Sequence, residues 1–190
     1  KSYVAYRPLG TILAVMPWNF PFWQVLRCAV PAIMAGNTVL LKHSSLVPGC
    51  ALELEKIFKE ANAPAGVFKT LLIHNNQTEK CIAHSSVSAV SFTGSTEAGK
   101  VIASLAGKYL KKCVLELGGS DPYIVLKDAD ISQAVKVCVK SRIKNSGQSC
   151  IAAKRFIIDH HIYDTFTKKF VEEMDKLVLG FPMAEPTNLG

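Results

Sequence analysis

The feature of this 190-residue sequence that most constrains its fold is a series of short, almost wholly apolar runs, each followed by a stretch with apolar residues at helical spacing. Such runs, bounded by glycine or proline, are typical of strands that are buried on both faces. Alternating strands and helices predict right-handed βαβ units, and therefore a parallel sheet covered by helices on both sides, a three-layer α/β fold. The expected strands are 11–16, 38–41, 67–73, 89–93 and 113–117.

The stretches between these runs predict helices. We expect one from Pro21 to Gly36, others at about 49–62 and 78–84, and one that begins at Ser95, whose hydroxyl is suited to cap free backbone N–H groups. Pro31 lies inside the first helix and predicts a kink or a local break, because proline has no N–H and its ring collides with the preceding turn.

The pattern changes after Gly118-Gly119-Ser120, where we place a domain boundary. Residues 1–118 form the first domain in this interpretation, and residues 119–190 form the beginning of a second α/β domain. The chain starts without Met and ends in a turn-rich segment, so we expect it to be a piece of a longer protein. The elements expected in the second part are strands at 123–126 and 155–158 and helices at 129–144 and 162–179.

Composition and charge exclude several classes of function. The sequence is 49% hydrophobic, but no apolar run reaches the roughly 18–20 residues that span a bilayer, and no basic-then-apolar leader opens it. We therefore expect a soluble, cytoplasmic protein without a membrane partner. The net charge of +7 comes from dispersed lysines without interleaved aromatic residues, which argues against nucleic-acid binding and for attraction of an anionic cofactor or substrate.

The six cysteines are scattered and form no C-x-x-C pair. This spacing argues for reduced thiols and against a disulfide framework or a zinc site, so no metal is predicted.

Polar side chains follow several of the predicted strands, at the edge where parallel sheets bind their ligands. Asn19 follows the first strand, Lys42 the second, and the Gly94-Ser95 turn the fourth. They offer an amide, an ammonium group and a helix N-terminus that favours phosphate. Each also has an ordinary interpretation, since Lys42 is equally well a solvated lysine and Gly94-Ser95 a plain helix cap.

Glu116 is harder to explain without a function. It lies between Leu115 and Leu117 in an apolar strand, and burying a carboxylate without a role is costly. We therefore expect a buried general base at this position.

Cys150 ends the segment Asn145-Ser146-Gly147-Gln148-Ser149-Cys150, between a helical pattern and the apolar run 156–158. A cysteine where a helix gives way to a strand can face a cleft, and Gly147 lets another molecule approach the backbone closely. Cys150 is thus a candidate nucleophile. The alternative is a small buried apolar residue, which describes most free cysteines.

Six motifs occur along the chain: Leu9-Gly10-Thr11-Ile12, Pro17-Trp18-Asn19-Phe20-Pro21, Ala35-Gly36-Asn37-Thr38, Phe92-Thr93-Gly94-Ser95, Leu115-Glu116-Leu117-Gly118-Gly119 and Asn145-x-Gly147-Gln148-x-Cys150. Their order and spacing resemble those of the aldehyde dehydrogenase superfamily, over essentially the whole chain. The segments 22–25, 41–43 and 111–122 are most similar to the bacterial succinate-semialdehyde dehydrogenase branch. The resemblance implies a Rossmann-like cofactor domain and, for the full-length enzyme, a homodimer or homotetramer.

The resemblance also implies catalytic roles. Cys150 would attack the aldehyde carbon, Asn19 would donate to the oxyanion, and Glu116 would activate the water that hydrolyses the thioester. The cofactor is NAD or NADP, with Ser45 at a place where NAD-preferring members often carry Glu, so both cofactors stay open. The residues implied in cofactor binding are Pro17, Trp18, Lys42, His43, Ser44, Ser45, Gly94, Ser95 and Leu117.

Two basic residues suggest an aldehyde that carries a carboxylate. Arg27 lies eight residues after Asn19, two helical turns along the same helix face, and resembles the arginine that binds the substrate carboxylate in succinate-semialdehyde dehydrogenases. Lys144 precedes the Cys150 segment and is a second candidate cation. A surface or structurally paired Arg27 is the alternative.

The sequence therefore predicts NAD(P)-dependent oxidation of a small aldehyde, succinic semialdehyde first among them. Other small aldehydes stay open as substrates. A fragment that binds only a nucleotide or a partner is a further alternative. A cysteine hydrolase built on Cys150 is disfavoured, because no histidine is expected near it.

Overall fold

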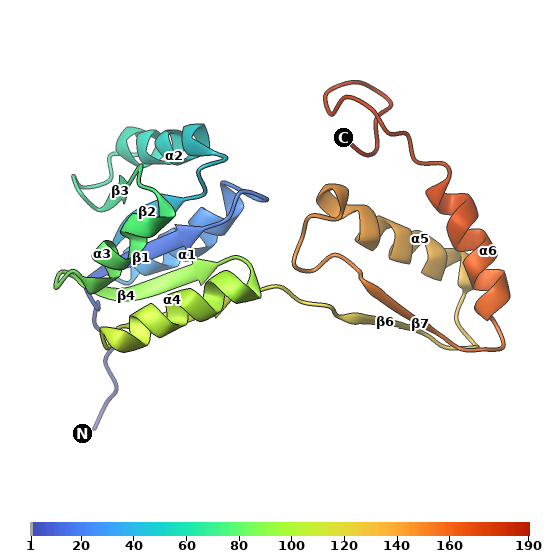
Figure 1. Cartoon of the computed structure of the whole chain (residues 1–190), viewed down its shortest axis with the longest axis horizontal. Helices are drawn as coiled ribbons and strands as arrows, with labels where there is room; N and C mark the ends of the chain where they lie inside the picture. The colour runs from blue at the N-terminus through green and yellow to red at the C-terminus, as the bar shows by residue number, and fades with distance from the viewer. Residues whose placement is uncertain (1) are drawn as a thin grey trace. The chain divides into compact units, whose positions relative to one another are not determined.

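A computed structural model describes residues 2–190, which form two compact units, one ending at Leu117 and the other spanning Gly118–Gly190 (Figure 1). Among the described residues, no helix combines the length and the apolar character needed to cross a bilayer.

The first unit contains a five-stranded sheet in which every neighbouring pair is parallel, with the order β3-β2-β1-β4-β5. This confirms the α/β fold class. Strand β1 is central. Strands β2 and β3 lie on one side of it, and strands β4 and β5 lie on the other. The strands are β1 (Thr11–Met16), β2 (Thr38–His43), β3 (Phe68–Thr70), β4 (Val87–Thr93) and β5 (Lys112–Glu116).

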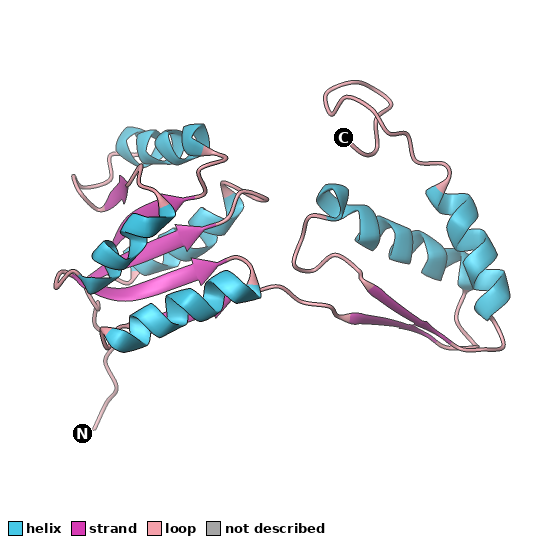
Figure 2. Cartoon of the chain, viewed as in Figure 1, coloured by secondary structure: helices cyan, strands magenta, loops and turns pink. Residues whose placement is uncertain are grey.

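Helices cover both faces of this sheet (Figure 2). Successive residues of β1 serve opposite cores, because side chains alternate along a strand. Ala14 packs with α1 (Trp23–Met34) and α2 (Pro48–Glu60), whereas Leu13 packs with α3 (Thr78–Ala83) and α4 (Thr96–Lys108). A short 3₁₀ helix, η1 (Asn75–Gln77), precedes α3.

Helix α1 continues through Pro31, so the break that was one of the two expected effects of this proline does not occur. Two other local expectations are wrong. Strand β2 runs on to His43, so Lys42 and His43 lie inside the strand and not after it, each paired in register with a residue of β1. Strand β3 has only three residues, and these are the residues that pair with β2.

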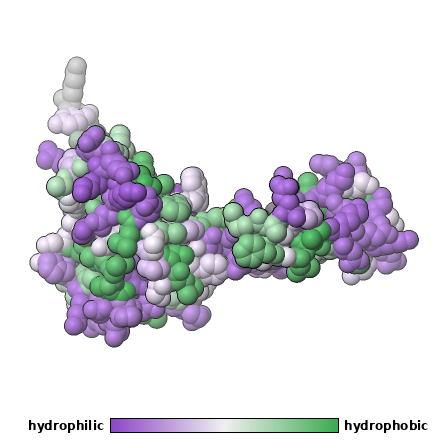
Figure 3. Space-filling view, turned by 90° about the horizontal axis from the view of Figure 1, so that it is seen from above, coloured by the Kyte–Doolittle hydropathy of each residue, from purple (hydrophilic) through white to green (hydrophobic). Residues whose placement is uncertain are grey.

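The second unit pairs β6 (Pro122–Val125) with β7 (Arg155–Ile158) in parallel, and α5 (Ile131–Ile143) and α6 (Tyr163–Met174) pack against them. Its core joins Val125 to Val135 and Phe166. Apolar side chains also reach the surface in both units, with green patches between hydrophilic ones (Figure 3). In the second unit these include Ile124 and Ile157.

Candidate active site

The strand order places a topological switch point between β1 and β4, where the chain leaves neighbouring strands in opposite directions. Ligands of such sheets bind beyond the carboxyl ends of the strands at this point. The segment Pro17-Trp18-Asn19 leaves β1 there, with Trp18 exposed and Asn19 partly buried. Gly94 and Ser95 leave β4 at the same edge.

The turn after β4 is built for a close backbone approach. The N–H of Gly94 donates to the carbonyl of Glu116 (3.0 Å), which joins the ends of β4 and β5. A Cβ on Gly94 would lie 2.5 Å from the ring of Phe92, so no other residue fits without movement. Ser95 caps α4 as expected, with its Oγ accepting from the N–H of Ala98 (3.2 Å). The turn therefore presents the positive end of a helix, which suits an anionic ligand.

Leu117 lies beside the same helix. A Cβ on Gly99 would lie 2.4 Å from the Leu117 side chain, so the absence of a side chain in α4 makes room for it. This contact places Leu117 against the first turns of α4, next to the Gly94-Ser95 turn that is predicted to bind phosphate.

A cavity of about 190 Å³ lies beyond the carboxyl ends of β2 and β3. Its lining includes Ser44 and Ser45, both predicted to contact the cofactor, together with the apolar Leu71 and Ile73. His74 lines it as well. Sequence reasoning missed His74. Ligands of parallel sheets bind beyond the carboxyl ends of the strands, and His74 directly follows the expected third strand, 67–73.

Lys42 is buried, so its interpretation as a solvated lysine is wrong. Its Nζ donates to Oδ1 of Asn75, the first residue of η1. Burial lowers the pKa of the Lys42 ammonium group, because water no longer stabilises the charge. An anionic ligand in this region would restore part of that lost stabilisation.

His43 is buried at the end of β2 and has both ring nitrogens occupied. Its Nε2 lies 2.9 Å from the carbonyl oxygen of Pro21, and its Nδ1 lies 2.9 Å from the backbone nitrogen of Ser44 and 3.2 Å from the carbonyl oxygen of Met16. Burial lowers the pKa of the imidazole, which favours its neutral form. His43 thus lines the cavity while fastening the segment that carries Asn19 to the end of β2.

Glu116 is not buried, and this expectation was wrong. It ends β5, the edge strand of the sheet, and 55% of its side chain is exposed. Its carboxylate lies 3.1 Å from the guanidinium of Arg27, whose side chain is 41% exposed. The structure therefore joins the predicted base, Glu116, and the predicted substrate-binding residue, Arg27, in one ion pair. Exposed ion pairs contribute little to the free energy of unfolding, about 0–1 kcal/mol. Stability alone therefore does not explain the pair between Arg27 and Glu116.

In the second unit, Cys150 lies in a loop with unusual backbone geometry. Asn145, Ser146 and Gly147 all have positive φ (52°, 54° and 75°), a conformation that costs energy for residues other than glycine. These three residues belong to the short 3₁₀ helix η2 (Lys144–Gly147), which is irregular at Asn145 and Ser146, and Cys150 itself is partly buried.

Arg142 holds this loop in place, a role that sequence reasoning missed. Its guanidinium donates to the carbonyls of Gly147 (2.9 Å) and Ala153 (2.6 Å), on either side of Cys150. A Cβ on Gly147 would lie 2.3 Å from Nη2 of Arg142, so this glycine is required for the contact. Lys154 adds a bond from its Nζ to the carbonyl of Cys150 (3.0 Å).

Four of the other five cysteines have surroundings that are unfavourable for a nucleophile. Burial raises the pKa of the thiols of Cys28, Cys81, Cys113 and Cys138. A raised pKa leaves the thiol protonated, and only the thiolate is a good nucleophile. Lys144, the second predicted substrate ligand, is an exposed residue at the end of α5 in the same unit as Cys150.

Together, the parallel sheet with its switch point between β1 and β4 and the helices on both faces define the class of doubly wound α/β proteins. The model of the family described as "Aldehyde dehydrogenase family" matches residues 1–190. The chain belongs to this family.

Among its relatives, the chain is 50% identical over 190 residues to succinate-semialdehyde dehydrogenase (NADP(+)) of Mycobacterium avium (strain 104) and 53% identical to succinate semialdehyde dehydrogenase (NAD(P)+) Sad of Escherichia coli (strain K12). All of this chain is covered, but only 40% and 41% of those proteins. The structure of succinic semialdehyde dehydrogenase from Streptococcus pyogenes in complex with NADP+ matches with a TM-score of 0.93 and 43% identity, over 96% of this chain and 40% of that one. The chain thus spans about two fifths of the length of these relatives.

Proposed function

We propose that the protein containing this chain is an NAD(P)-dependent dehydrogenase that oxidises succinic semialdehyde to the dicarboxylate. The first unit would hold the cofactor and the second would carry the nucleophile. Relatives that are at least 50% identical over the chain and are named succinate-semialdehyde dehydrogenases support the reaction class.

The residues of the first unit fit the adenosine end of the cofactor. The cavity beyond β2 and β3 is partly apolar, which suits a base, and Ser44, Ser45 and His74 supply hydrogen-bonding groups. The buried Lys42 ammonium group adds a positive charge on the adenosine side, and the N-terminus of α4 suits the negative charge of the pyrophosphate. When bound, the cofactor supplies the hydride acceptor for the oxidation.

The chemistry on the aldehyde falls to the chain's own residues. The Cys150 thiolate attacks the aldehyde carbon, and the carbonyl oxygen becomes an oxyanion. The side-chain amide of Asn19 and the backbone N–H of Cys150 donate to that oxyanion. Loss of hydride from the carbon leaves a thioester on Cys150. Arg142, which anchors the loop on both sides, keeps the sulfur in position throughout.

Glu116 then takes a proton from water, and the resulting hydroxide attacks the thioester carbon. The carbon–sulfur bond breaks, releasing the acid and regenerating the thiolate. The half-exposed carboxylate has access to water, and its ion pair with Arg27 holds it in a defined direction.

The observation that carries the choice of substrate is the guanidinium of Arg27, which is half exposed beside the proposed base. Arginine can bind a carboxylate through two parallel hydrogen bonds. An aldehyde with a carboxylate at its far end would engage Arg27, whereas a plain aldehyde would not.

We expect Arg27→Leu to lower kcat/KM for succinic semialdehyde by about 10- to 150-fold, the value of one charged hydrogen-bonded contact of about 1.5–3 kcal/mol. The rate of NAD(P)H production in the complete protein measures this. Butanal is the internal control, because it has the same length and no carboxylate, and its kcat/KM should change little.

Arg27→Lys retains the charge but not the bidentate geometry. Its kcat/KM for succinic semialdehyde should therefore lie between the values of the unaltered protein and of Arg27→Leu. An equal loss for both aldehydes would show that Arg27 serves Glu116 or the fold and not the substrate. In that outcome the dehydrogenase assignment would stand, and the carboxylated substrate would not.

For the cofactor, we expect Ser45→Glu to shift the ratio of kcat/KM toward NAD by about 1–2 kcal/mol, roughly 5- to 30-fold, since a carboxylate in the cavity would repel a 2′-phosphate. Ser85→Glu is the matched control. It adds the same charge just before β4, at the amino ends of the strands and away from the cavity at their carboxyl ends. If the two variants have the same cofactor ratio, Ser45 does not face the 2′ position.

A further inference from the structure

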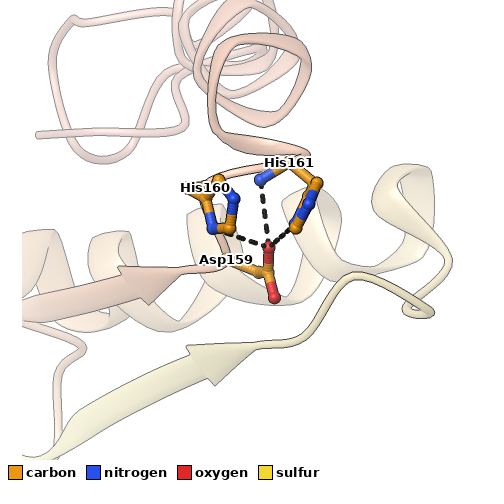
Figure 4. Close-up of side chains that lie close together, drawn as sticks. All are labelled: Asp159, His160 and His161. Atoms are coloured by element: carbon orange, nitrogen blue, oxygen red, sulfur yellow. Dashed lines mark hydrogen bonds and ion pairs between the residues drawn. The ribbon is translucent and has the colours of Figure 1, made fainter.

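Three side chains at the end of β7 point toward one another, outside the residues used above (Figure 4). Asp159, His160 and His161 are consecutive in the sequence, and they lie between β7 and α6. Each offers one possible metal-ligand atom, and these atoms all lie within 4.8 Å of one another.

The distances within the cluster are close to those of a chelate. Oδ1 of Asp159 lies 3.6 Å from Nδ1 of His160 and 2.9 Å from Nδ1 of His161. Two ligand atoms held about 2.0–2.1 Å from a tetrahedral zinc ion are roughly 3.3 Å apart. The two distances to Asp159 lie on either side of this value, and all three ligand atoms lie within 4.8 Å of one another, so side-chain rotation can bring them onto one ion.

Backbone contacts hold the cluster in this arrangement. The N–H of Asp159 donates to the carbonyl of Val125 (2.9 Å), which extends the pairing of β7 with β6. The N–H of Ile162 donates to the carbonyl of Asp159 (3.1 Å), and the N–H of His161 donates to Oδ1 of Asp159 (3.0 Å). Residues in an extended strand would point to alternate sides, so the turn is what brings three consecutive side chains together.

Exposure also suits a metal site with open positions. The side chain of Asp159 is 25% exposed, whereas those of His160 and His161 are 83% and 62% exposed. The carboxylate is thus the fixed ligand, and water can complete the coordination on the open side.

We propose that Asp159, His160 and His161 bind a divalent transition-metal ion of the zinc, nickel and cobalt group. Two imidazole nitrogens favour these ions, whereas Mg²⁺ and Ca²⁺ prefer a shell of oxygen atoms. Without metal, the Nδ1–H of His161 donates to the Asp159 carboxylate. The ion takes the place of that proton, and the carboxylate then serves as a direct ligand.

The cluster escapes a search for cysteine pairs, since it contains no cysteine. The other three histidines are His43, His74 and His84, far from it in sequence. His84 is exposed and lies in the first unit, which makes it a suitable control.

Isothermal titration calorimetry of the 190-residue chain with NiCl₂ tests the proposal. Removing a group that merely orients a metal ligand typically costs about 10- to 100-fold in affinity, so losing a ligand should cost at least about tenfold. We expect that loss for His160→Ala, His161→Ala and Asp159→Asn, each checked for native circular dichroism. His84→Ala and Cys150→Ser should bind Ni²⁺ as the unaltered chain does.

Cobalt distinguishes the ligands directly. A Co²⁺ complex of the unaltered chain should show d–d bands without a thiolate-to-cobalt charge-transfer band. Such a thiolate band would assign the ion to a cysteine and overturn the proposal. Unchanged Ni²⁺ affinity in both histidine variants, or no binding by the unaltered chain at millimolar Ni²⁺, would also overturn it.

Discussion

Replacing Cys150 with alanine should abolish dehydrogenase activity in the complete protein while cofactor binding persists. The substitution removes the sulfur that forms the covalent intermediate, and losing a covalent nucleophile typically costs on the order of 10⁴- to 10⁶-fold in kcat. Cofactor binding should survive because the proposed cofactor residues lie in the other unit. Steady-state NAD(P)H production measures the first effect, and a fluorescence titration with NAD(P)H measures the second.

Cys28→Ala and Cys138→Ala are the matched controls. Burial raises the pKa of both thiols, so neither should supply a thiolate near neutral pH. Removing them from partly or fully buried positions should lower stability, not activity per folded molecule. Near-normal turnover by Cys150→Ala, or an equal loss of turnover in all three variants, would refute the assignment of Cys150 as nucleophile.

The second large effect should come from Glu116→Gln, which leaves the size of the side chain unchanged and removes its ability to accept a proton. General-base catalysis typically contributes about 10²- to 10⁴-fold, so steady-state turnover should fall by that factor. Formation of the thioester does not need this base. Rapid mixing should therefore show a burst of about one NAD(P)H per active site, followed by slow turnover, and the thioester should be detectable by mass spectrometry.

Glu53→Gln serves as the control, because Glu53 is an exposed carboxylate on α2 whose ion-pair partner is Lys56. It should leave both phases unchanged. If Glu116→Gln instead removes the burst together with the steady-state rate, Glu116 acts before or during thioester formation, and its role as the hydrolytic base is wrong.

The ion pair between Arg27 and Glu116 links these results to substrate choice. If a substrate carboxylate binds Arg27, it competes with Glu116 for the same guanidinium. Glu116 would then be less constrained when the correct substrate is present. Comparing the slow phase of succinic semialdehyde with that of butanal in the unaltered protein shows whether this competition affects hydrolysis.

Sequence alone was sufficient for the parallel α/β sheet and for the edge at which to look for ligands. Strands buried on both faces appear as continuous apolar runs, so the runs at 11–16 and 89–93 could be assigned without knowledge of their partners. The Ser95 cap was equally predictable, because a helix N-terminus requires an acceptor within a few residues. Motif order and spacing pointed to the family.

Tertiary structure decided which of these residues meet. The burial of Lys42 and His43 depends on their pairing with β1, and the exposure of Glu116 follows from the place of β5 at the sheet edge. The contact of Arg27 with Glu116 joins positions 89 residues apart (116 − 27), and the hold of Arg142 on both sides of Cys150 requires the closed loop. Hydrophobic periodicity reports which side of an element is buried. It carries no information about which distant side chain lies opposite, and the chemistry of the site depends on that pairing.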